Sequence, residues 1–332
     1  MSRVLLVGAG AAGTRAARQL VETRHVSEVL VVDADHDRSR SLASAIDGCV
    51  ALDADPEAAL ADDVDAVALA SGDTRELSFV EAAIATGTPA ATVTDDADAL
   101  LQLLQLDGTA AAAGVTVAIG CGLAPGLADV MVRHAADEFD AVDEIRIARS
   151  GVAGPTCTKA AHRARRGTPR EWKDQDWAEL SRGARDEAVW FPEPVGVAEC
   201  RGVDGGAVLL ARAFPEASRV SYRIAEPPAR LTSRLERRRA AAEAEWGSAR
   251  VEVWGRRGQA LRTTVYGVIE RTAVAAGVVL ALTAARLAGD GASIRRPGVH
   301  GLAELVTPTA FLTDLADRGV RIAVFEGTAA AS

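Results

Sequence analysis

The sequence is poor in several residue types, and each shortage excludes a class of protein. Its four cysteines, Cys49, Cys121, Cys157 and Cys200, lie far apart and include no Cys-x-x-Cys pair, which excludes a disulfide-dense scaffold. The five histidines have no cysteine or carboxylate partners at metal-ligand spacing, so we expect no metal site. We therefore expect a reduced, cytoplasmic protein that holds no metal.

Long hydrophobic runs are also missing. The most apolar stretch, Ala273 to Ala285, is too short to cross a bilayer and is followed by Arg286. The first residues run directly into a strand pattern, and we see no signal peptide. The net charge of -9 argues against a dedicated nucleic-acid binder. We expect neither membranes nor nucleic acids as partners.

Lysine is scarce. Lys159 and Lys173 are the only lysines among 37 basic residues, so 35 are arginines. We interpret this imbalance as a GC-rich coding bias, which makes clusters such as Arg163, Arg165 and Arg166 poor evidence for a phosphate site. The two lysines carry correspondingly more information.

Short apolar strands alternate with helical patterns through the first 120 residues. A chain of 332 residues is long enough for two domains. Continuous Val, Leu and Ala runs are typical of parallel strands that are buried on both faces. Strands are expected at Arg3–Val7, Glu28–Val32, Cys49–Leu52, Ala66–Ala70, Ala90–Val93 and Val115–Ile119. Helices are expected at Ala11–Glu22, Arg38–Ala45, Pro56–Ala61, Arg75–Thr86 and Ala97–Gly114. This alternation predicts an α/β fold with a Rossmann-type, doubly wound parallel sheet.

The remaining sequence predicts a second α/β domain with a mixed or antiparallel sheet. Its clearest feature is a hairpin, Arg250–Arg256 and Leu261–Glu270, that turns at Gly258. Helices are expected at Pro125–Phe139, Thr158–Arg166, Arg230–Glu245, Thr272–Leu287 and Pro308–Asp317, and further strands at Asp143–Ser150 and Arg321–Phe325. We assign residues 1–122 to a dinucleotide-binding domain and 123–305 to a substrate and dimerisation domain. Residues 306–332 are expected to pack back on the first domain.

A Gly-x-Gly-x-x-Gly motif joins the first strand to the first helix. Gly8 permits the tight turn, Gly10 lets a pyrophosphate approach the backbone, and Gly13 lets the helix pack close to the strand. Ala11 and Ala12 between them offer no capping side chain, so the first helical N–H groups are available to an anion. The motif predicts a dinucleotide site, with a structural glycine turn as the alternative.

Asp33 closes the second strand, twenty residues after Gly13. A carboxylate there can accept hydrogen bonds from both ribose hydroxyls and repels a 2′-phosphate, at ~4 kcal/mol per charge pair before screening. This favours NAD over NADP. Arg38 and Arg40 leave NADP open, because an arginine can hold the phosphate. A plain strand-end turn is the structural alternative for Asp33.

Several further residues follow strands at the carboxyl edge of the predicted sheet. We expect Ser71 and Gly72 to border the cofactor and Thr94 to border the substrate. Pro125 fits the first position of a helix, so Ala124 would be its cap and could supply no capping oxygen. The N–H groups of this Gly122–Gly126 loop are candidates for a substrate carboxylate, although a glycine-rich hinge explains them equally well.

These motifs resemble the saccharopine dehydrogenase family. The resemblance rests on the glycine motif, on Ala85-x-Gly87-Thr-Pro89 before Thr92–Asp95, and on Gly122-x-x-Pro125-Gly126-Leu127, and it covers residues 1 to about 130. It implies a two-domain NAD(P)-dependent oxidoreductase, often a homodimer, that acts on carbon–nitrogen bonds between an amine and an oxo acid or aldehyde. The chain departs from the family at Leu123-Ala124, where members often carry an aromatic-Asp pair.

Lys159 and His162 are the candidate reacting groups. They lie three residues apart, which places both on one face of a helix. Forming or reducing an imine needs proton transfer at nitrogen, and histidine can perform it near neutral pH. We assign acid–base catalysis to His162 and substrate orientation to Lys159. A solvated basic helix is the simpler alternative.

The sequence therefore predicts hydride transfer between NAD(P) and a carbon–nitrogen bond of a small amino-acid-derived substrate. Hydride transfer at a carbonyl, as in semialdehyde or homoserine-type dehydrogenases, is a second interpretation. A third is a non-catalytic NAD(H)-binding regulatory protein, because potassium-channel regulatory domains share the Asp-x-Asp pattern of Asp33-Ala34-Asp35. Val7, which precedes the glycines, argues against a methyltransferase.

Overall fold

The computed structural model divides the chain into two compact units. Unit 1 comprises residues 1–94, 98–122 and 273–306, and unit 2 comprises residues 95–97, 123–272 and 307–332. The structure describes residues 1–61, 63–71, 75–181, 184–226, 246–289 and 294–325. The helix expected at Arg230–Glu245 lies outside these residues.

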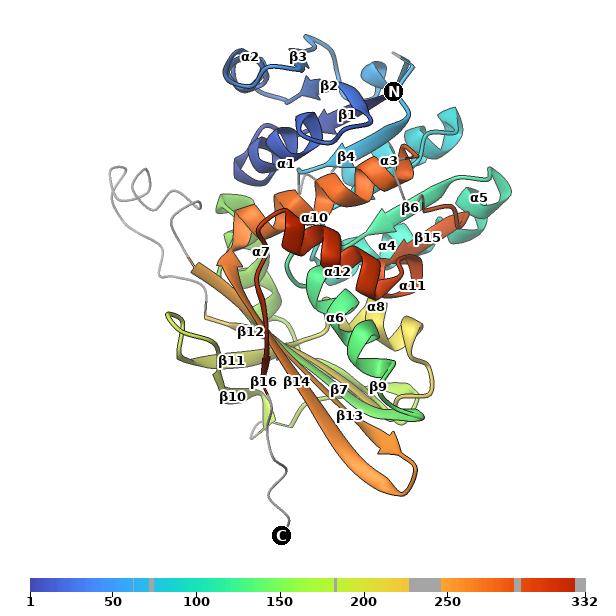
Figure 1. Ribbon diagram of the computed structural model, residues 1–332. Coiled ribbons are helices and arrows are strands. Elements are labelled where there is room, and N and C mark those ends of the chain that lie inside the picture. Colours follow the sequence, from blue (N-terminus) through green and yellow to red (C-terminus); the bar gives the residue numbers. More distant parts are fainter. Residues whose placement is uncertain (62, 72–74, 182–183, 227–245, 290–293, 326–332) are drawn as a thin grey trace. The chain divides into compact units, whose positions relative to one another are not determined.

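Unit 1 is built on a seven-stranded parallel sheet with the order β15-β6-β5-β4-β1-β2-β3 (Figure 1). Its strands are β1 (Ser2–Val7), β2 (Val26–Val32), β3 (Cys49–Ala51), β4 (Ala66–Leu69), β5 (Ala90–Thr92), β6 (Thr116–Ile119) and β15 (Gly298–Gly301). The side chains of β4, β5 and β6 are buried along their whole length, as expected for a sheet covered on both faces. The prediction of a Rossmann-type, doubly wound sheet is confirmed.

Helices of unit 1 connect these strands. They are α1 (Ala11–Val21), α2 (His36–Ala45), the 3₁₀ helix η1 (Ala58–Ala61), α3 (Glu76–Thr86), α4 (Ala97–Leu104), α5 (Asp107–Ala112), α10 (Thr272–Leu287) and α11 (Leu302–Leu305). The single helix expected over Ala97–Gly114 is in fact two, α4 and α5. Helix α10 packs closely on α1 at Gly277, where a Cβ atom would meet the Ala12 carbonyl oxygen at 2.7 Å.

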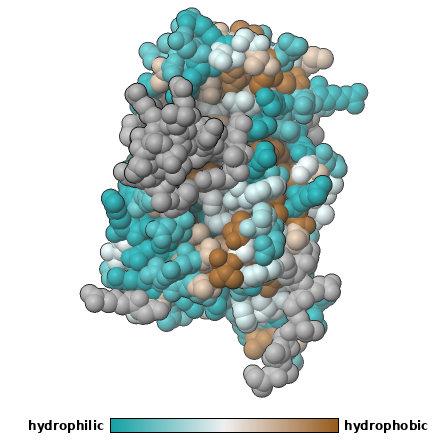
Figure 2. Space-filling view, turned by 90° about the vertical axis from the view of Figure 1, so that its left-hand side faces the viewer, coloured by the Kyte–Doolittle hydropathy of each residue, from teal (hydrophilic) through white to brown (hydrophobic). Residues whose placement is uncertain are grey.

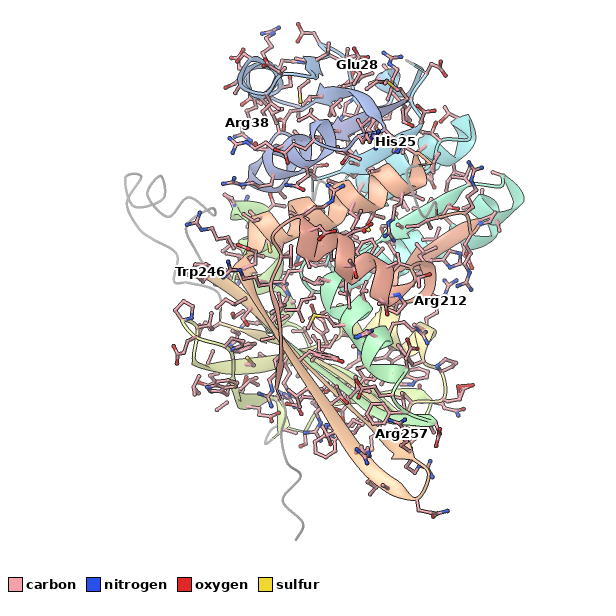
Figure 3. All side chains as sticks on the ribbon, viewed as in Figure 1. His25, Glu28, Arg38, Arg212, Trp246 and Arg257 are labelled. Carbon is pink, nitrogen blue, oxygen red and sulfur yellow. The ribbon has the colours of Figure 1, made fainter. Side chains whose placement is uncertain are left out.

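Unit 2 is built on a nine-stranded mixed sheet. Its main path is β10-β11-β12-β7-β13-β14-β16, and only β12 and β7 pair in parallel along it. The strands are β7 (Ala141–Ser150), β8 (Arg170–Lys173), β9 (Asp176–Glu179), β10 (Asp186–Trp190), β11 (Val197–Val203), β12 (Arg219–Ala225), β13 (Trp246–Arg257), β14 (Ala260–Arg271) and β16 (Ile322–Phe325). Figure 3 labels Trp246 and Arg257 at the two ends of β13. The expected mixed sheet and its hairpin at Gly258 are confirmed.

The helices of unit 2 are α6 (Leu127–Ala136), α7 (Pro155–Arg166), α8 (Ala207–Ala213) and α12 (Pro308–Asp317). Helix α6 packs on β7 and β13, and α12 packs on α6. Alternate residues of β13, such as Val251 and Val253, are fully buried and form this core face. The opposite face carries arginine–tryptophan pairs, such as Arg146 over the ring of Trp254. Hydrophobic residues on the face seen in Figure 2 form small groups between hydrophilic ones.

The domain boundaries predicted after residue 272 are wrong. Residues 273–306 belong to unit 1, because β15 adds a parallel strand beside β6. Residues 307–325 belong to unit 2, because β16 pairs with β14 and α12 packs on α6. The chain therefore returns to unit 1 and then to unit 2. Sequence periodicity identifies elements but not their pairing partners, which explains the error.

Candidate functional site

The glycine motif of unit 1 forms a tight turn between β1 and α1. Gly8 has a φ of +102°, and a Cβ atom there would lie 3.1 Å from the Ser71 nitrogen. A Cβ atom on Gly13 would overlap the Gly8 carbonyl oxygen, so this position requires glycine. At Gly10 a Cβ atom would meet nothing within 4 Å, so the space in front of the loop is open. Two glycines therefore shape the loop, and the third leaves it approachable.

The N-terminus of α1 is free of a side-chain cap. Gly10 is the N-cap residue, no side chain caps it, and the first turn contains no acidic residue. The Gly8 and Ala9 amides are already used, because Gly8 N–H donates to the Val32 oxygen at 2.8 Å and Ala9 N–H donates to Asp33 at 2.6 Å. The amides from Gly10 onward, together with the helix dipole, suit a phosphate group.

Asp33 lies beside this loop and holds it in place. Its Oδ2 accepts from Ala9 N–H, and its Oδ1 accepts from Asp35 N–H at 2.9 Å. Each carboxylate oxygen has further lone-pair capacity, so these bonds leave room for hydroxyl donors.

Arg38 and Arg40, which could in principle hold the 2′-phosphate of NADP, are paired with carboxylates. Arg38 pairs with Asp35 at 3.2 Å, and Arg40 pairs with Asp53 at 2.7 Å and with Asp37 at 3.1 Å. The hydrogen bond from Arg40 lowers the pKa of Asp53 below its usual value. Figure 3 shows Arg38 at the outer edge of unit 1. Both arginines are therefore already engaged by carboxylates.

The other candidates in unit 1 follow its strands. Ser71 follows β4 and packs against Gly8. Thr94 follows β5, is buried, and donates its N–H to Thr92 Oγ1 at 3.3 Å. Gly122 follows β6. Gly72 lies outside the described residues. Those described all follow the carboxyl ends of neighbouring strands, where open α/β sheets bind ligands.

The expected uncapped helix start at Pro125 is wrong. Helix α6 begins at Leu127 with Gly126 as its N-cap, and the Ala124–Pro125 peptide is cis. Gly126 N–H donates to Asp129 Oδ2 at 3.1 Å, and Ala128 N–H donates to the Leu123 oxygen at 3.0 Å. Asp129 therefore supplies the capping carboxyl group that Ala124 lacks, and these donors are occupied.

Helix α7 carries Lys159 and His162, as predicted. Lys159 is exposed, whereas His162 is half-buried. His162 Nε2 is inaccessible to solvent and has no hydrogen-bond partner among the described residues. The two side chains thus lie on one face of the helix but differ in their exposure to solvent.

A buried polar cluster in unit 2 was not predicted from the sequence. Arg149 of β7 donates to Asp95 Oδ2 at 2.7 Å and to the Gly151 oxygen at 3.4 Å. Cys157 of α7 lies 3.7 Å from the same Asp95 oxygen. Burial lowers the pKa of Arg149, but the Asp95 carboxylate, together with Tyr222 and Cys157, more than offsets this effect, so the pKa of Arg149 lies above its usual value. Burial raises the pKa of Cys157 to about 11, so this thiol is not a nucleophile near neutral pH.

Asp129 and Tyr222 complete this cluster. Burial raises the pKa of Asp129 to about 8, against the lowering effect of its bond from Gly126, so the carboxyl group is mostly protonated at neutral pH. Burial also raises the pKa of Tyr222; Arg149 lowers it, while Asp129 and Asp95 raise it further. We define the polar cluster as Asp95, Asp129, Arg149, Cys157 and Tyr222. Perturbed groups of this kind concentrate at functional sites.

Sequence reasoning missed the cluster because its members come from separate segments. Asp95 entered the sequence analysis only as the last residue of the Thr92–Asp95 segment, and the arginine bias lowered the weight of every arginine. The one available signal was Asp129, three residues after Gly126, at the spacing of a capping carboxylate.

Comparisons with known proteins support this fold. Residues 4–112 match the model of the TrkA-N domain. Saccharopine dehydrogenase (L-Glu forming) from Saccharomyces cerevisiae is similar over 98% of this chain and 100% of that chain, with a TM-score of 0.68 and 15% identity. The chain has a saccharopine dehydrogenase-like fold. Amine dehydrogenase from Mycobacterium smegmatis covers 92% of this chain and 96% of its own, with a TM-score of 0.57 and 13% identity. GenD2 from gentamicin A biosynthesis, solved in complex with NAD, has a TM-score of 0.51 and 16% identity, over 98% of this chain and 97% of its own.

The described residues contain neither a helix suited to span a membrane nor a group of side chains suited to hold a metal ion. Among the described residues, no helix has both the length and the hydropathy that a membrane span requires. Within the same part of the chain, no group of three or more His, Cys, Asp or Glu side chains could hold a metal ion.

Proposed function

We propose that the protein is an NAD-dependent oxidoreductase of the saccharopine dehydrogenase family. It would transfer a hydride at the carbon–nitrogen bond of a small amino-acid-derived substrate. The observation that carries this proposal is the uncapped N-terminus of α1 behind a loop in which Gly13 has no room for a side chain. The likeness to saccharopine dehydrogenase over nearly the whole chain supports the reaction class.

The residues of unit 1 fit a dinucleotide. The amides of Gly10, Ala11, Ala12 and Gly13 would hold the pyrophosphate, and Asp33 would accept from the adenosine ribose. Ser71, next to Gly8, would line the same loop. When bound, the nicotinamide supplies or accepts the hydride. The carboxylates around Asp33, which already hold Arg38 and Arg40, favour NAD over NADP.

Proton transfer is assigned to His162. An amine nitrogen must lose or gain a proton when the carbon–nitrogen bond changes order, and imidazole does this near neutral pH. Its Nε2 has no hydrogen-bond partner among the described residues, so this nitrogen keeps its capacity to donate or accept a proton. The exposed Lys159 would orient an anionic substrate group. Thr94 and Gly122, which follow β5 and β6, are proposed to line the substrate.

Cofactor binding and turnover test the proposal in two steps. Titration with NADH and NADPH, followed by fluorescence, should show binding with a preference for NADH. A screen of amines paired with oxo acids should then show oxidation of NADH at 340 nm for at least one pair, by the absorbance of the reduced nicotinamide. Turnover with aldehydes or ketones alone would favour the carbonyl interpretation instead. A homodimer stays a prediction, which light scattering would test.

A non-catalytic NAD(H)-binding regulator is the second candidate. The match of residues 4–112 to the TrkA-N domain favours it, since that match is confined to the dinucleotide-binding part of the chain. A regulator would bind NADH but would not oxidise it with any amine and oxo acid pair. The polar cluster of unit 2 argues for catalysis, because a pure sensor has no need for buried ionisable groups outside its nucleotide site.

A further inference from the structure

Helix α3 of unit 1 buries a carboxyl group in its first turn. Glu76 is only 6% exposed, and glutamate is almost never buried unless its carboxyl group is paired. The Glu76 carboxyl group accepts a hydrogen bond from the hydroxyl of Thr92, the fully buried last residue of β5. Stability alone does not explain this pair, because two apolar residues of the same shape in its place would be nearly neutral or stabilising.

The Thr92 hydroxyl links Glu76 to the backbone that follows β5. Its one proton is donated to Glu76, and its lone pairs accept from Thr94 N–H at 3.3 Å. The Thr92 carbonyl oxygen accepts from Cys121 N–H at 2.7 Å, in the segment that follows β6. Thr92 therefore holds the two segments that leave β5 and β6, and Glu76 fixes the direction of its hydroxyl group.

Thr92 lies in the row of residues at which the parallel strands end. Val32, Val7, Leu69 and Thr92 are successive partners across β2, β1, β4 and β5. The glycine loop follows Val7, where we propose the pyrophosphate, and Asp33 follows Val32, where we propose the adenosine ribose. The adenosine half of the cofactor would therefore extend toward β2. The nicotinamide half would extend in the opposite direction, past β4 to β5, about 10 Å or two strand spacings from β1.

We propose that Glu76 is a positioning residue for the nicotinamide half of the cofactor. Both Glu76 and Thr92 are buried, so they act through the backbone at Thr94 rather than by contact with the cofactor. The nicotinamide and the reacting carbon of the substrate meet beside this backbone, and hydride transfer depends on their precise placement. The inference rests on the proposed function, because it requires a nicotinamide cofactor.

Calorimetry of the full chain with NADH and with ADP-ribose tests this role. ADP-ribose contains the adenosine, the pyrophosphate and the second ribose but no nicotinamide. Thr92→Val keeps the shape of the side chain and removes its hydroxyl group. It should weaken NADH binding about tenfold and leave ADP-ribose binding within about twofold. The readout is the ratio of the two Kd values, because a general loss of structure in unit 1 would weaken both ligands.

Thr88→Val is the matched control. Thr88 is also a buried threonine of unit 1, but it precedes β5 at the amino end of the strand, where its hydroxyl bonds to the Thr86 hydroxyl at 2.9 Å. This variant should bind both ligands as the natural protein does. Thr92→Ser keeps the hydroxyl group and should bind both ligands within about twofold of the natural protein.

Glu76→Gln tests whether Glu76 acts through Thr92. It keeps the size of the side chain but offers the Thr92 hydroxyl a weaker, neutral acceptor, so it should weaken NADH binding by less than Thr92→Val does. In the Thr92→Val background it should change NADH binding no further, because the bond that joins the two residues is already lost.

The outcomes separate this inference from the proposed function. If the natural protein binds NADH and Thr92→Val leaves the ratio of Kd values unchanged, the role of Glu76 is wrong and the proposed function stands. The same ratio change in Thr88→Val also overturns the role. If Thr92→Val does not fold, Glu76→Gln decides, and an unchanged ratio in that variant overturns the inference. Absence of NADH binding in the natural protein overturns the proposed function, and this inference with it.

Discussion

The two units hold their candidate functional groups in opposite ways. In unit 1 the groups are backbone amides on consecutive residues, Gly10 to Gly13, and their arrangement depends on residues without side chains. In unit 2 the groups are side chains of Asp95, Asp129, Arg149 and Tyr222, which come from four separate segments. A site built from backbone amides can be predicted from a short sequence motif. A site built from side chains of separate segments depends on the folding of the sheet that brings them together.

The largest expected effect comes from a substitution that introduces a methyl group into the glycine loop. Gly13→Ala places a Cβ atom onto the Gly8 carbonyl oxygen, so we expect loss of NADH binding and a destabilisation of about 1–3 kcal/mol or more. Gly10→Ala is the matched control, since its Cβ meets nothing within 4 Å and its φ of -78° suits alanine. It should unfold as the natural protein does and bind NADH more weakly. Thermal unfolding and fluorescence titration measure both. Equal NADH affinity in Gly13→Ala would contradict the account.

In unit 2, we expect turnover to fall strongly when the imidazole of His162 is removed by substitution. His162→Ala should lower kcat by about 10²–10⁴-fold, the usual contribution of a positioned general acid or base, with NADH binding unchanged. Arg163→Ala, on the same helix but with a side chain that is 73% exposed, should keep most of its activity. Lys159→Ala should raise KM more than it lowers kcat. Steady-state kinetics with the best substrate pair measures these effects. Unchanged turnover in His162→Ala removes the assignment.

The buried carboxyl group of Asp129 makes the stability of the fold depend on pH. Burial raises its pKa to about 8, whereas an unfolded aspartate titrates near about 3.9. Between these values the folded state binds the additional proton, so the free energy of unfolding should fall as the pH rises, by up to about 1.4 kcal/mol per pH unit. Asp129→Asn should abolish this contribution. Denaturant unfolding of both proteins from pH 5 to 8 measures the difference. Parallel pH profiles would show that the Asp129 carboxyl is ionised throughout.

The smallest expected effect concerns the choice of cofactor. Asp33→Asn removes the charge that repels a 2′-phosphate, so the preference for NADH over NADPH should fall by about tenfold after screening by solvent. Asp53→Asn, which removes one of the two carboxylates that pair with Arg40, should change the preference less. Paired titrations with both cofactors give the ratio. An unchanged ratio in Asp33→Asn would mean that Asp33 only holds the loop through Ala9.

The same contrast explains how much of the molecule could be predicted. The strands of unit 1 were found because β4, β5 and β6 are short apolar runs, and α1 because it follows a glycine motif. Strands β8 to β10 were missed because they are short and partly exposed, with no apolar alternation. The return of residues 273–306 to unit 1 depends on the pairing of β15 with β6, which no local pattern encodes.

The candidate site divides along the same line. Gly8, Gly13 and Asp33 could be placed from spacing alone, because their roles are set by neighbours in the chain. The role of Asp129 could not, because its burial and its raised pKa depend on the sheet that α6 covers. Pro125 was assigned to the first position of the helix because proline fits there. In the structure, Gly126 and Asp129 form the cap instead.

Calorimetric titration of the full chain with NADH tests the central claim most directly, with Gly13→Ala as the comparison. The account predicts saturable one-site binding with a Kd in the range of about 1 μM to 1 mM, and none for the variant. Absence of heat with both NADH and NADPH in a folded natural protein would contradict it.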